Sequence, residues 1–300
     1  MKKIIVVGSL NMDIVLKVPH IPAPGETILA TNVSLAAGGK GANQAVGIGK
    51  LGGNVCMLGR LGQDPYGQEL YDSLEKNKVN TEGIVFDDDL PTGNAYICVS
   101  DKGENSIVVN PGANSALDPE QIKKYEWLFN EASYCLIQLE IPKDTVEYVL
   151  QICQEKKVKV IFNPAPAKPL KDELLKDLFL LVPNENEISI LCSGSATLEE
   201  KAKELLDKNV QNIIVTLGER GCMLANKEGI QYFPAAPFEA VDTTGAGDSF
   251  IAGLAVALAE DNNLETAIKF ASYVAGLTIT KVGAQPSLPD RKTVNCYINI

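Results

Sequence analysis

Short, continuously apolar runs recur along most of this chain, and stretches with helical periodicity separate them. The runs lie within KKIIVVGS at 2–9, NVCMLGRLG at 54–62, SYCLIQLE at 133–140 and QNIIVTLG at 211–218. Strands that are apolar on both faces are typical of a parallel sheet covered by helices on its two sides. The pattern therefore predicts a three-layer α/β/α sandwich around a central, mostly parallel sheet.

Two regions interrupt this alternation, at about residues 14–37 and 92–110. The first contains three prolines and then the alternating run TILATNVSLAA, and the second places two alternating runs around Asp101-Lys102-Gly103. Alternation on either side of a glycine-containing turn is a hairpin signal. We expect a small antiparallel sheet here, inserted into a single domain spanning residues 1–300. Such a sheet suits a lid over a site or a dimer surface.

Charge and composition restrict the partners of the chain. Its 300 residues are 45% hydrophobic and carry a formal net charge of -11. An acidic surface repels a phosphate backbone, so no nucleic-acid partner is expected, and any phosphate site must be built locally. The seven cysteines form no CxxC pair, and no apolar run approaches the roughly 20 residues that cross a bilayer. We therefore expect a cytoplasmic protein without a membrane partner.

The stretch DTTGAGDSF at 242–250 precedes the apolar run IAGLAVALA. Glycines let a ligand approach the backbone, and the first amides of a helix favour an anion. A carboxylate at Asp248 could then take the proton of an alcohol that attacks a phosphoryl group. The alternative is that Asp248 is only a helix N-cap beside an ordinary turn. The pattern alone does not decide between them.

Polar residues also follow other predicted strands. GSLNMD at 8–13 ends the first strand, Glu140 ends a later one, and GGKGANQA at 38–45 opens a helix of small residues. Ligands of parallel sheets bind beyond the carboxyl ends of the strands. Carboxylates and amides gathered at that edge suit a polyhydroxylated ligand, although each residue alone is more typical of a turn.

Together these stretches resemble the ribokinase family of carbohydrate and nucleoside kinases, in order and over nearly the whole length. The motifs are GSLNMD at 8–13, GGKGANQA at 38–45, QLE at 138–140, NPAPA at 163–167, PNENE at 183–187, TLGERG at 216–221, DTTGAGDSF at 242–250 and GAQPS at 283–287.

The resemblance implies transfer of the γ-phosphate of ATP to the 5-hydroxyl of D-ribose, or of a related sugar or nucleoside such as deoxyribose or fructose. Asp248 matches the catalytic base and also a sugar contact, and the backbone of residues 245–248, with Gly245, Ala246 and Gly247, matches the anion hole. The remaining sugar contacts match Asn11, Asp13, Gly39, Lys40, Asn43 and Glu140. The ATP contacts match Asn184, Thr216, Gly218, Gly221 and Gly247.

The resemblance also implies cations and a partner. Asn184 and Glu187 match a motif that positions Mg2+ and phosphate, with Glu187 acting through water. The family's K+ site matches Asp242, Thr244, Thr278, Lys281, Gly283 and Ser287, several of them through backbone carbonyls. A lid that clasps a second subunit implies a homodimer.

Two other classes of function are open to such a chain. A catalytically silent sugar sensor could share the scaffold, but Asp248 and its glycines argue against it. A nicotinamide dehydrogenase needs a G-x-G-x-x-G fingerprint, and the first strand offers only VVGSLNMD.

Overall fold

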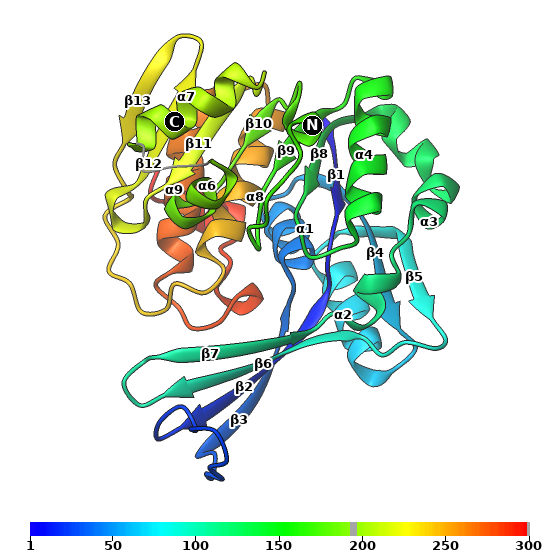
Figure 1. Ribbon diagram of the computed structural model, residues 1–300, viewed down its shortest axis with the longest axis vertical. Coiled ribbons are helices and arrows are strands. Elements are labelled where there is room, and N and C mark those ends of the chain that lie inside the picture. The colour runs from blue at the N-terminus through cyan, green and yellow to red at the C-terminus, as the bar shows by residue number, and fades with distance from the viewer. Residues whose placement is uncertain (193–196, 299–300) are drawn as a thin grey trace.

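The computed structural model describes residues 1–192 and 197–298. Its main sheet has the strand order β13-β12-β11-β10-β9-β8-β1-β4-β5 (Figure 1). The strands are β1 Lys3–Val7, β4 Asn54–Gly62, β5 Asn80–Asp87, β8 Ala132–Ile137, β9 Lys159–Phe162, β10 Leu180–Leu181, β11 Asn212–Thr216, β12 Cys222–Asn226 and β13 Gly229–Phe233. Pairing is parallel from β5 to β11 and antiparallel from β11 to β13.

The apolar runs form this sheet because both of its faces are buried. In β1, Ile4 and Val6 enter one hydrophobic core while Ile5 and Val7 enter the other. Successive side chains of a strand point to opposite faces, so an unbroken apolar run feeds two cores. The predicted three-layer sandwich is confirmed.

Helices cover both faces of the sheet. One core contains side chains from α1 Lys40–Lys50, α2 Pro65–Lys76, α8 Ala246–Ala259, α9 Leu264–Thr278 and α10 Arg291–Asn295. The other contains side chains from α3 Pro119–Lys124, α4 Lys143–Lys156, α5 Asp172–Leu175, α6 Glu185–Leu191 and α7 Leu198–Asp207. Short 3-10 turns span Gly112–Ala116, Glu126–Glu131, Gly218–Arg220 and Gln285–Ser287. Across the described residues, no helix combines the length and apolarity needed to cross a bilayer.

Helix α8 is the most enclosed of these helices. Every residue from Asp248 to Ala259 is buried, and the helix packs against α1 and α9. A helix that is apolar on all sides needs neighbours all round. This packing holds the start of α8 in a fixed place at the carboxyl edge of the sheet.

A second, four-stranded sheet projects from the body as the lid (Figure 1). Its order is β3-β2-β6-β7, with β2 Asn11–Val18, β3 Asn32–Gly38, β6 Gly93–Ser100 and β7 Asn105–Asn110. The prediction of an antiparallel sheet is wrong at its centre, because β2 and β6 pair in parallel. Both strands leave the carboxyl edge of the parallel main sheet, so they run outward in the same direction.

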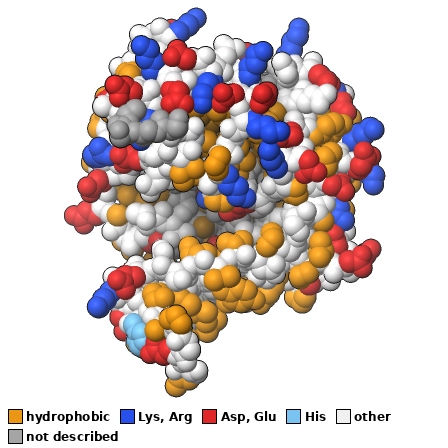
Figure 2. Space-filling view, viewed as in Figure 1, with side chains coloured by type: hydrophobic (Ala, Val, Ile, Leu, Met, Phe, Trp, Pro, Cys, Tyr) orange, Lys and Arg blue, Asp and Glu red, His pale blue; other side chains and the backbone are white. Residues whose placement is uncertain are grey.

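An apolar row crosses one face of the lid. Ile14 pairs with Leu35 on one side and Tyr96 on the other, and Tyr96 pairs with Val108. Leu35, Tyr96 and Val108 are 48%, 45% and 66% exposed. Figure 2 shows hydrophobic side chains gathered on the lid and a recess between the lid and the body. We call Val33, Leu35, Tyr96 and Val108 the lid patch.

Candidate active site

The start of α8 is a candidate anion site. Its N-cap is Gly245, whose φ of 76° turns the chain out of loop 242–244 into the helix. Among the described residues, none offers a backbone acceptor to the N–H groups of Gly247 and Asp248. These groups and the positive end of the helix dipole favour a negatively charged ligand. They border a cavity of about 220 Å³.

Gly247 is not required by the packing of the protein. A Cβ built at this position would meet no atom within 4 Å. Its φ also lies outside the positive range, so the backbone conformation does not demand glycine. The bare backbone therefore leaves the cavity wall open for close approach by a ligand.

Asp248 is not the N-cap, so that alternative for its role is wrong. It lies in the first turn of α8 and is 8% exposed. Its Oδ2 accepts a hydrogen bond of 2.9 Å from Nδ2 of Asn43, and its Oδ1 one of 3.0 Å from Nε2 of Gln44. Two amide donors from α1 thus compensate a buried carboxylate at the mouth of the anion site.

The cavity gathers residues from the carboxyl ends of several strands. Its lining comprises Lys40, Asn163, Ala165, Val182, Asn184, Glu187, Thr216, Thr243, Gly245, Ala246, Gly247, Asp248 and Ile251. The Asp248 carboxylate is the main group that raises the pKa of Lys40, so the ammonium remains charged beside it. A cation, a carboxylate and open amides therefore face one small space.

Asn184 and Glu187 form a capping box at the start of α6. Asn184 Oδ1 accepts from the Glu187 N–H, and Glu187 Oε2 accepts from the Asn184 N–H, each at 2.8 Å. Burial raises the pKa of Glu187, and the charge of Asp248 raises it further. Two carboxylates on one cavity fit a hydrated divalent cation, which relieves their repulsion.

The predicted sugar contacts lie between the body and the base of the lid. Glu140 Oε2 accepts from Ser9 Oγ and, at 3.1 Å, from the Lys40 N–H. Asn11 Oδ1 accepts from Asn114 Nδ2 at 2.8 Å. Asn43 Oδ1 is buried without a protein partner, so it can accept from a ligand hydroxyl.

Asp13, on β2, completes this side of the site. Burial raises its pKa to about 7, and the charges of Glu140 and Asp248 add to the effect. Its carboxyl group lies against the backbone of Gly38, where a Cβ would be 2.2 Å from Oδ2. Gly39 follows with φ 86° as the N-cap of α1, so the second glycine-rich motif begins the helix whose first residue, Lys40, lines the cavity.

The predicted K+ residues lie on two segments: Asp242 and Thr244 on the loop before α8, and the others between Thr278, the last residue of α9, and Ser287, in the 3-10 turn Gln285–Ser287. Asp242 Oδ1 accepts from the Thr244 N–H at 2.9 Å, and Oδ2 accepts from the Gly283 N–H at 2.8 Å. Thr278 and Ser287 use their hydroxyls on Val274 and Ala284 carbonyls. Lys281 lies between these two residues in sequence. A carboxylate held by two backbone N–H groups, on loops that also offer carbonyl oxygens, is a donor set that fits a monovalent cation.

Two of the predicted ATP contacts lie outside the cavity. Gly218 and Gly221 bound the turn after β11, whereas Thr216 reaches the lining. Sequence reasoning also missed Gln44, Gln138, Asn163 and Thr243. Each lies inside a motif already noted, but its role depends on which strand ends meet, and no single motif encodes that.

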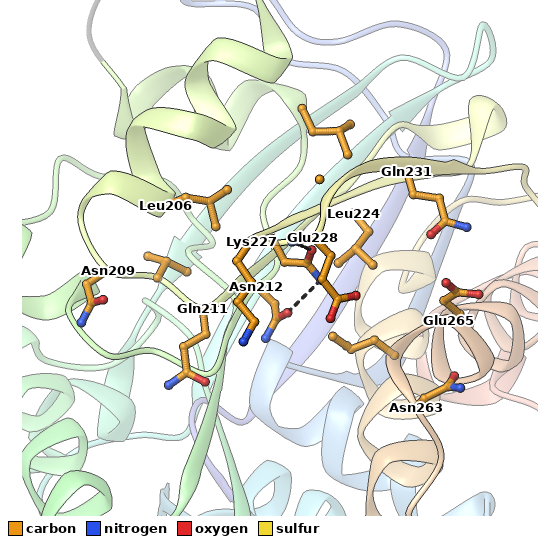
Figure 3. A pocket seen from close by; sticks show the side chains of 15 residues that line it. Leu206, Asn209, Gln211, Asn212, Leu224, Lys227, Glu228, Gln231, Asn263 and Glu265 are labelled. Carbon is orange, nitrogen blue, oxygen red and sulfur yellow. Dashed lines mark hydrogen bonds between the residues drawn. The ribbon is translucent and has the colours of Figure 1, made fainter.

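A larger cavity, of about 900 Å³, lies at the opposite edge of the sheet (Figure 3). Its amide side chains largely serve local structure. Asn212 Nδ2 donates to the Phe179 carbonyl, and Asn263 caps α9. This cavity adds no catalytic group to those described above.

A buried carboxylate beside an anion site and a polar pocket defines a phosphotransferase that acts on a hydroxyl group. Comparison with known proteins identifies the family. The chain belongs to the pfkB family of carbohydrate kinases, whose family profile matches residues 1–291. The family resemblance seen in the sequence is confirmed.

Individual relatives agree with this assignment. The chain is 39% identical over 301 residues to a ribokinase of Bacillus subtilis, covering 98% of each chain. It is 33% identical over 302 residues to a deoxyribokinase of Salmonella typhi, covering 99% of each. A structure of Arabidopsis thaliana ribokinase complexed with ribose and ATP matches with a TM-score of 0.93 and 33% identity, covering 100% of this chain and 99% of that one.

The raised pKa of Asp13 predicts a pH-dependent stability of the ligand-free protein. Between about pH 4 and pH 7 the folded state keeps a proton on Asp13 that the unfolded state releases. The free energy of unfolding therefore falls over this range, by about 3–4 kcal/mol, and levels off above it. Asp13→Asn should remove this contribution, so that the free energy of unfolding measured in urea titrations falls less as the pH rises through this range.

Asp88→Asn, an exposed change of the same charge, is the matched control and should leave the slope in place. If Asp13→Asn and the original protein lose stability in parallel as the pH rises, Asp13 does not carry the effect.

Proposed function

We propose that the chain transfers the γ-phosphate of ATP to the 5-hydroxyl of D-ribose, giving D-ribose 5-phosphate and ADP. The observation that carries the proposal is the position of Asp248, which two α1 amides hold at the mouth of the anion site. Full-length similarity to ribokinases, one of them complexed with ribose and ATP, supports the choice of substrates.

In this mechanism Asp248 acts as the general base. Its carboxylate takes the proton of the 5-hydroxyl while that oxygen forms a bond to the γ-phosphorus and the bond to the ADP oxygen breaks. Within the predicted segment 245–248, the open N–H groups of Gly247 and Asp248, with the Lys40 ammonium, face the charge that develops on the phosphoryl oxygens, whereas the Ala246 N–H donates to the Thr243 carbonyl. Asn11, Asp13, Gly39, Asn43 and Glu140 hold the sugar so that the hydroxyl is in line.

The nucleotide would bind beyond the ends of β10 and β11, away from the sugar. Its contacts there would be Asn184, Thr216, Gly218 and Gly221. Glu187 would hold Mg2+ through water, and the ion would supply positive charge to the phosphates. This answers the difficulty that an acidic protein meets in binding ATP. A lid over the sugar would exclude water and limit wasteful hydrolysis.

The K+ site would act through the loop that leads into the anion site. Asp242 joins segment 241–245 to segment 279–283 through its hydrogen bonds. A cation bound by the carbonyls there would fix this loop. Gly245 and Ala246, only a few residues along, would then be held in position for phosphate.

A sugar panel tests the function. We expect D-ribose to give the highest kcat/KM, about 10-fold or more above 2-deoxy-D-ribose, D-fructose and a nucleoside. The missing hydroxyl of 2-deoxy-D-ribose leaves a buried polar group unpaired, whereas the extra carbon of fructose and the base of a nucleoside add bulk to the pentose. Turnover should rise when K+ is added. The measurement is sugar phosphate formed at matched concentrations, with and without K+. A preference for 2-deoxy-D-ribose would reassign the substrate within the family.

Replacing the base tests the mechanism. Asp248→Asn keeps the size of the side chain and should lower kcat by about 10²- to 10⁴-fold, because the proton acceptor is lost. Ribose binding, measured by calorimetry, should persist. Asp88→Asn makes the same chemical change at an exposed carboxylate outside the cavity lining and serves as the comparison. Undiminished turnover in Asp248→Asn would refute the assigned role.

We further propose that the lid forms a homodimer through the lid patch. Val33, Leu35, Tyr96 and Val108 present apolar side chains on one face, and an exposed row of this kind marks an interaction surface. A second copy of the same sheet would offer the complementary apolar face.

Val108→Lys should therefore convert a dimer to a monomer in analytical ultracentrifugation, because the buried charge would have no partner. Ile230→Lys, on the exposed edge strand β13, is the matched control and should remain dimeric. A Val108→Lys protein that still sediments as a dimer would place the interface elsewhere.

A further inference from the structure

Gln44 is buried in α1 and has no exposed surface. Its Nε2 lies 3.0 Å from Asp248 Oδ1 and 3.5 Å from Asn163 Oδ1, and its Oε1 accepts from Gln138 Nε2 at 2.7 Å. The side chain thus contacts one carboxylate oxygen of Asp248 from helix α1, while Asn43 contacts the other. None of the sugar or nucleotide contacts proposed above includes it.

The charge of Asp248 fixes the orientation of this amide. An ionised carboxylate only accepts hydrogen bonds, so the NH2 group of Gln44 must face it. The carbonyl oxygen of Gln44 must then face Gln138, whose NH2 group donates to it. A chain of two buried amides therefore ends on the base, and reversing either amide would break a bond within it.

Gln138, the second of these two amides, packs closely against a glycine. Gln138 follows β8 directly and is fully buried, and its Oε1 lies where a side chain on Gly8 would stand. A Cβ on Gly8 would be 2.1 Å from that atom. Gly8 follows β1, so two neighbouring strand ends fix Gln138, and Gln138 fixes Gln44.

We propose that Gln44 is a positioning residue for the base, with Gln138 holding it in place. This rests on the proposed role of Asp248. Asn43 and Gln44 bind opposite oxygens of the carboxylate, so together they fix the plane of the group. Each oxygen keeps a free lone pair, and the fixed plane aims one of them at the hydroxyl. With only Asn43 present, the carboxylate can rotate out of line.

Gln44→Met keeps the length of the side chain and removes its donor. We expect kcat to fall by about 10- to 100-fold with the KM for ribose changed by less than about 3-fold, because misplacing a reacting group affects the transition state and not sugar binding. Gln121→Met is the matched control. Gln121 is also buried and donates to the Gly59 carbonyl at 3.0 Å. The Gln121→Met protein should therefore lose stability but keep the kcat of the unaltered protein.

A double-mutant cycle separates positioning from folding. In the Asp248→Asn background, Gln44→Met should cause no further loss of residual turnover, because there is no carboxylate left to orient. Gln138→Met should lower kcat by a smaller factor and add nothing to Gln44→Met. If Gln44→Met does not fold, Gln138→Met and its combination with Asp248→Asn provide the same comparison.

Independent effects of Gln44→Met and Asp248→Asn, multiplying in the double variant, would overturn the proposal. So would a rise in KM with kcat unchanged. The activity of the unaltered protein separates the two hypotheses. If it phosphorylates no sugar, the proposed function fails. If it is active and Gln44→Met leaves kcat unchanged, only the positioning role is refuted.

Discussion

This site depends on one interaction, in which two amide side chains of α1 donate to the buried carboxylate of Asp248 on α8. Asp248 lies in the first turn of α8, a helix enclosed on every side, and its carboxylate would be costly to ionise there without donors. Asn43 and Gln44 provide them, so α1 and α8 must pack in one register. The geometry of the proposed base and the packing of α1 against α8 therefore rest on the same contacts.

The parallel sheet explains why distant motifs meet. Residues after β1, β8, β9 and β10 all leave the carboxyl edge, which brings together Ser9, Glu140, Asn163 and Asn184 from across the sequence. The opposite edge has a larger cavity, but its amides are engaged in caps and turns. The topology of the sheet, and not the size of a cavity, therefore places the candidate site residues at its carboxyl edge.

The sequence was most informative where one residue type answers to one local constraint. Unbroken apolar runs required two buried faces, and Gly245-Ala246-Gly247 indicated a helix start open to a ligand. It was less informative where partners are far apart. Nothing near Gln44 indicates that it meets Asp248, some 200 residues away. The parallel pairing of β2 and β6 was missed for the same reason, since each hairpin alone suggests only antiparallel neighbours.

Strand β2 belongs to two parts of the molecule at once. Its first part carries the proposed sugar contacts Asn11 and Asp13, while its continuation forms the middle of the lid. A swing of the lid about the short connection at residues 8–10 would carry both side chains with it. Under the proposed function, recognition of the sugar and movement of the lid would therefore be mechanically coupled, and a substrate that does not contact β2 would leave the lid open.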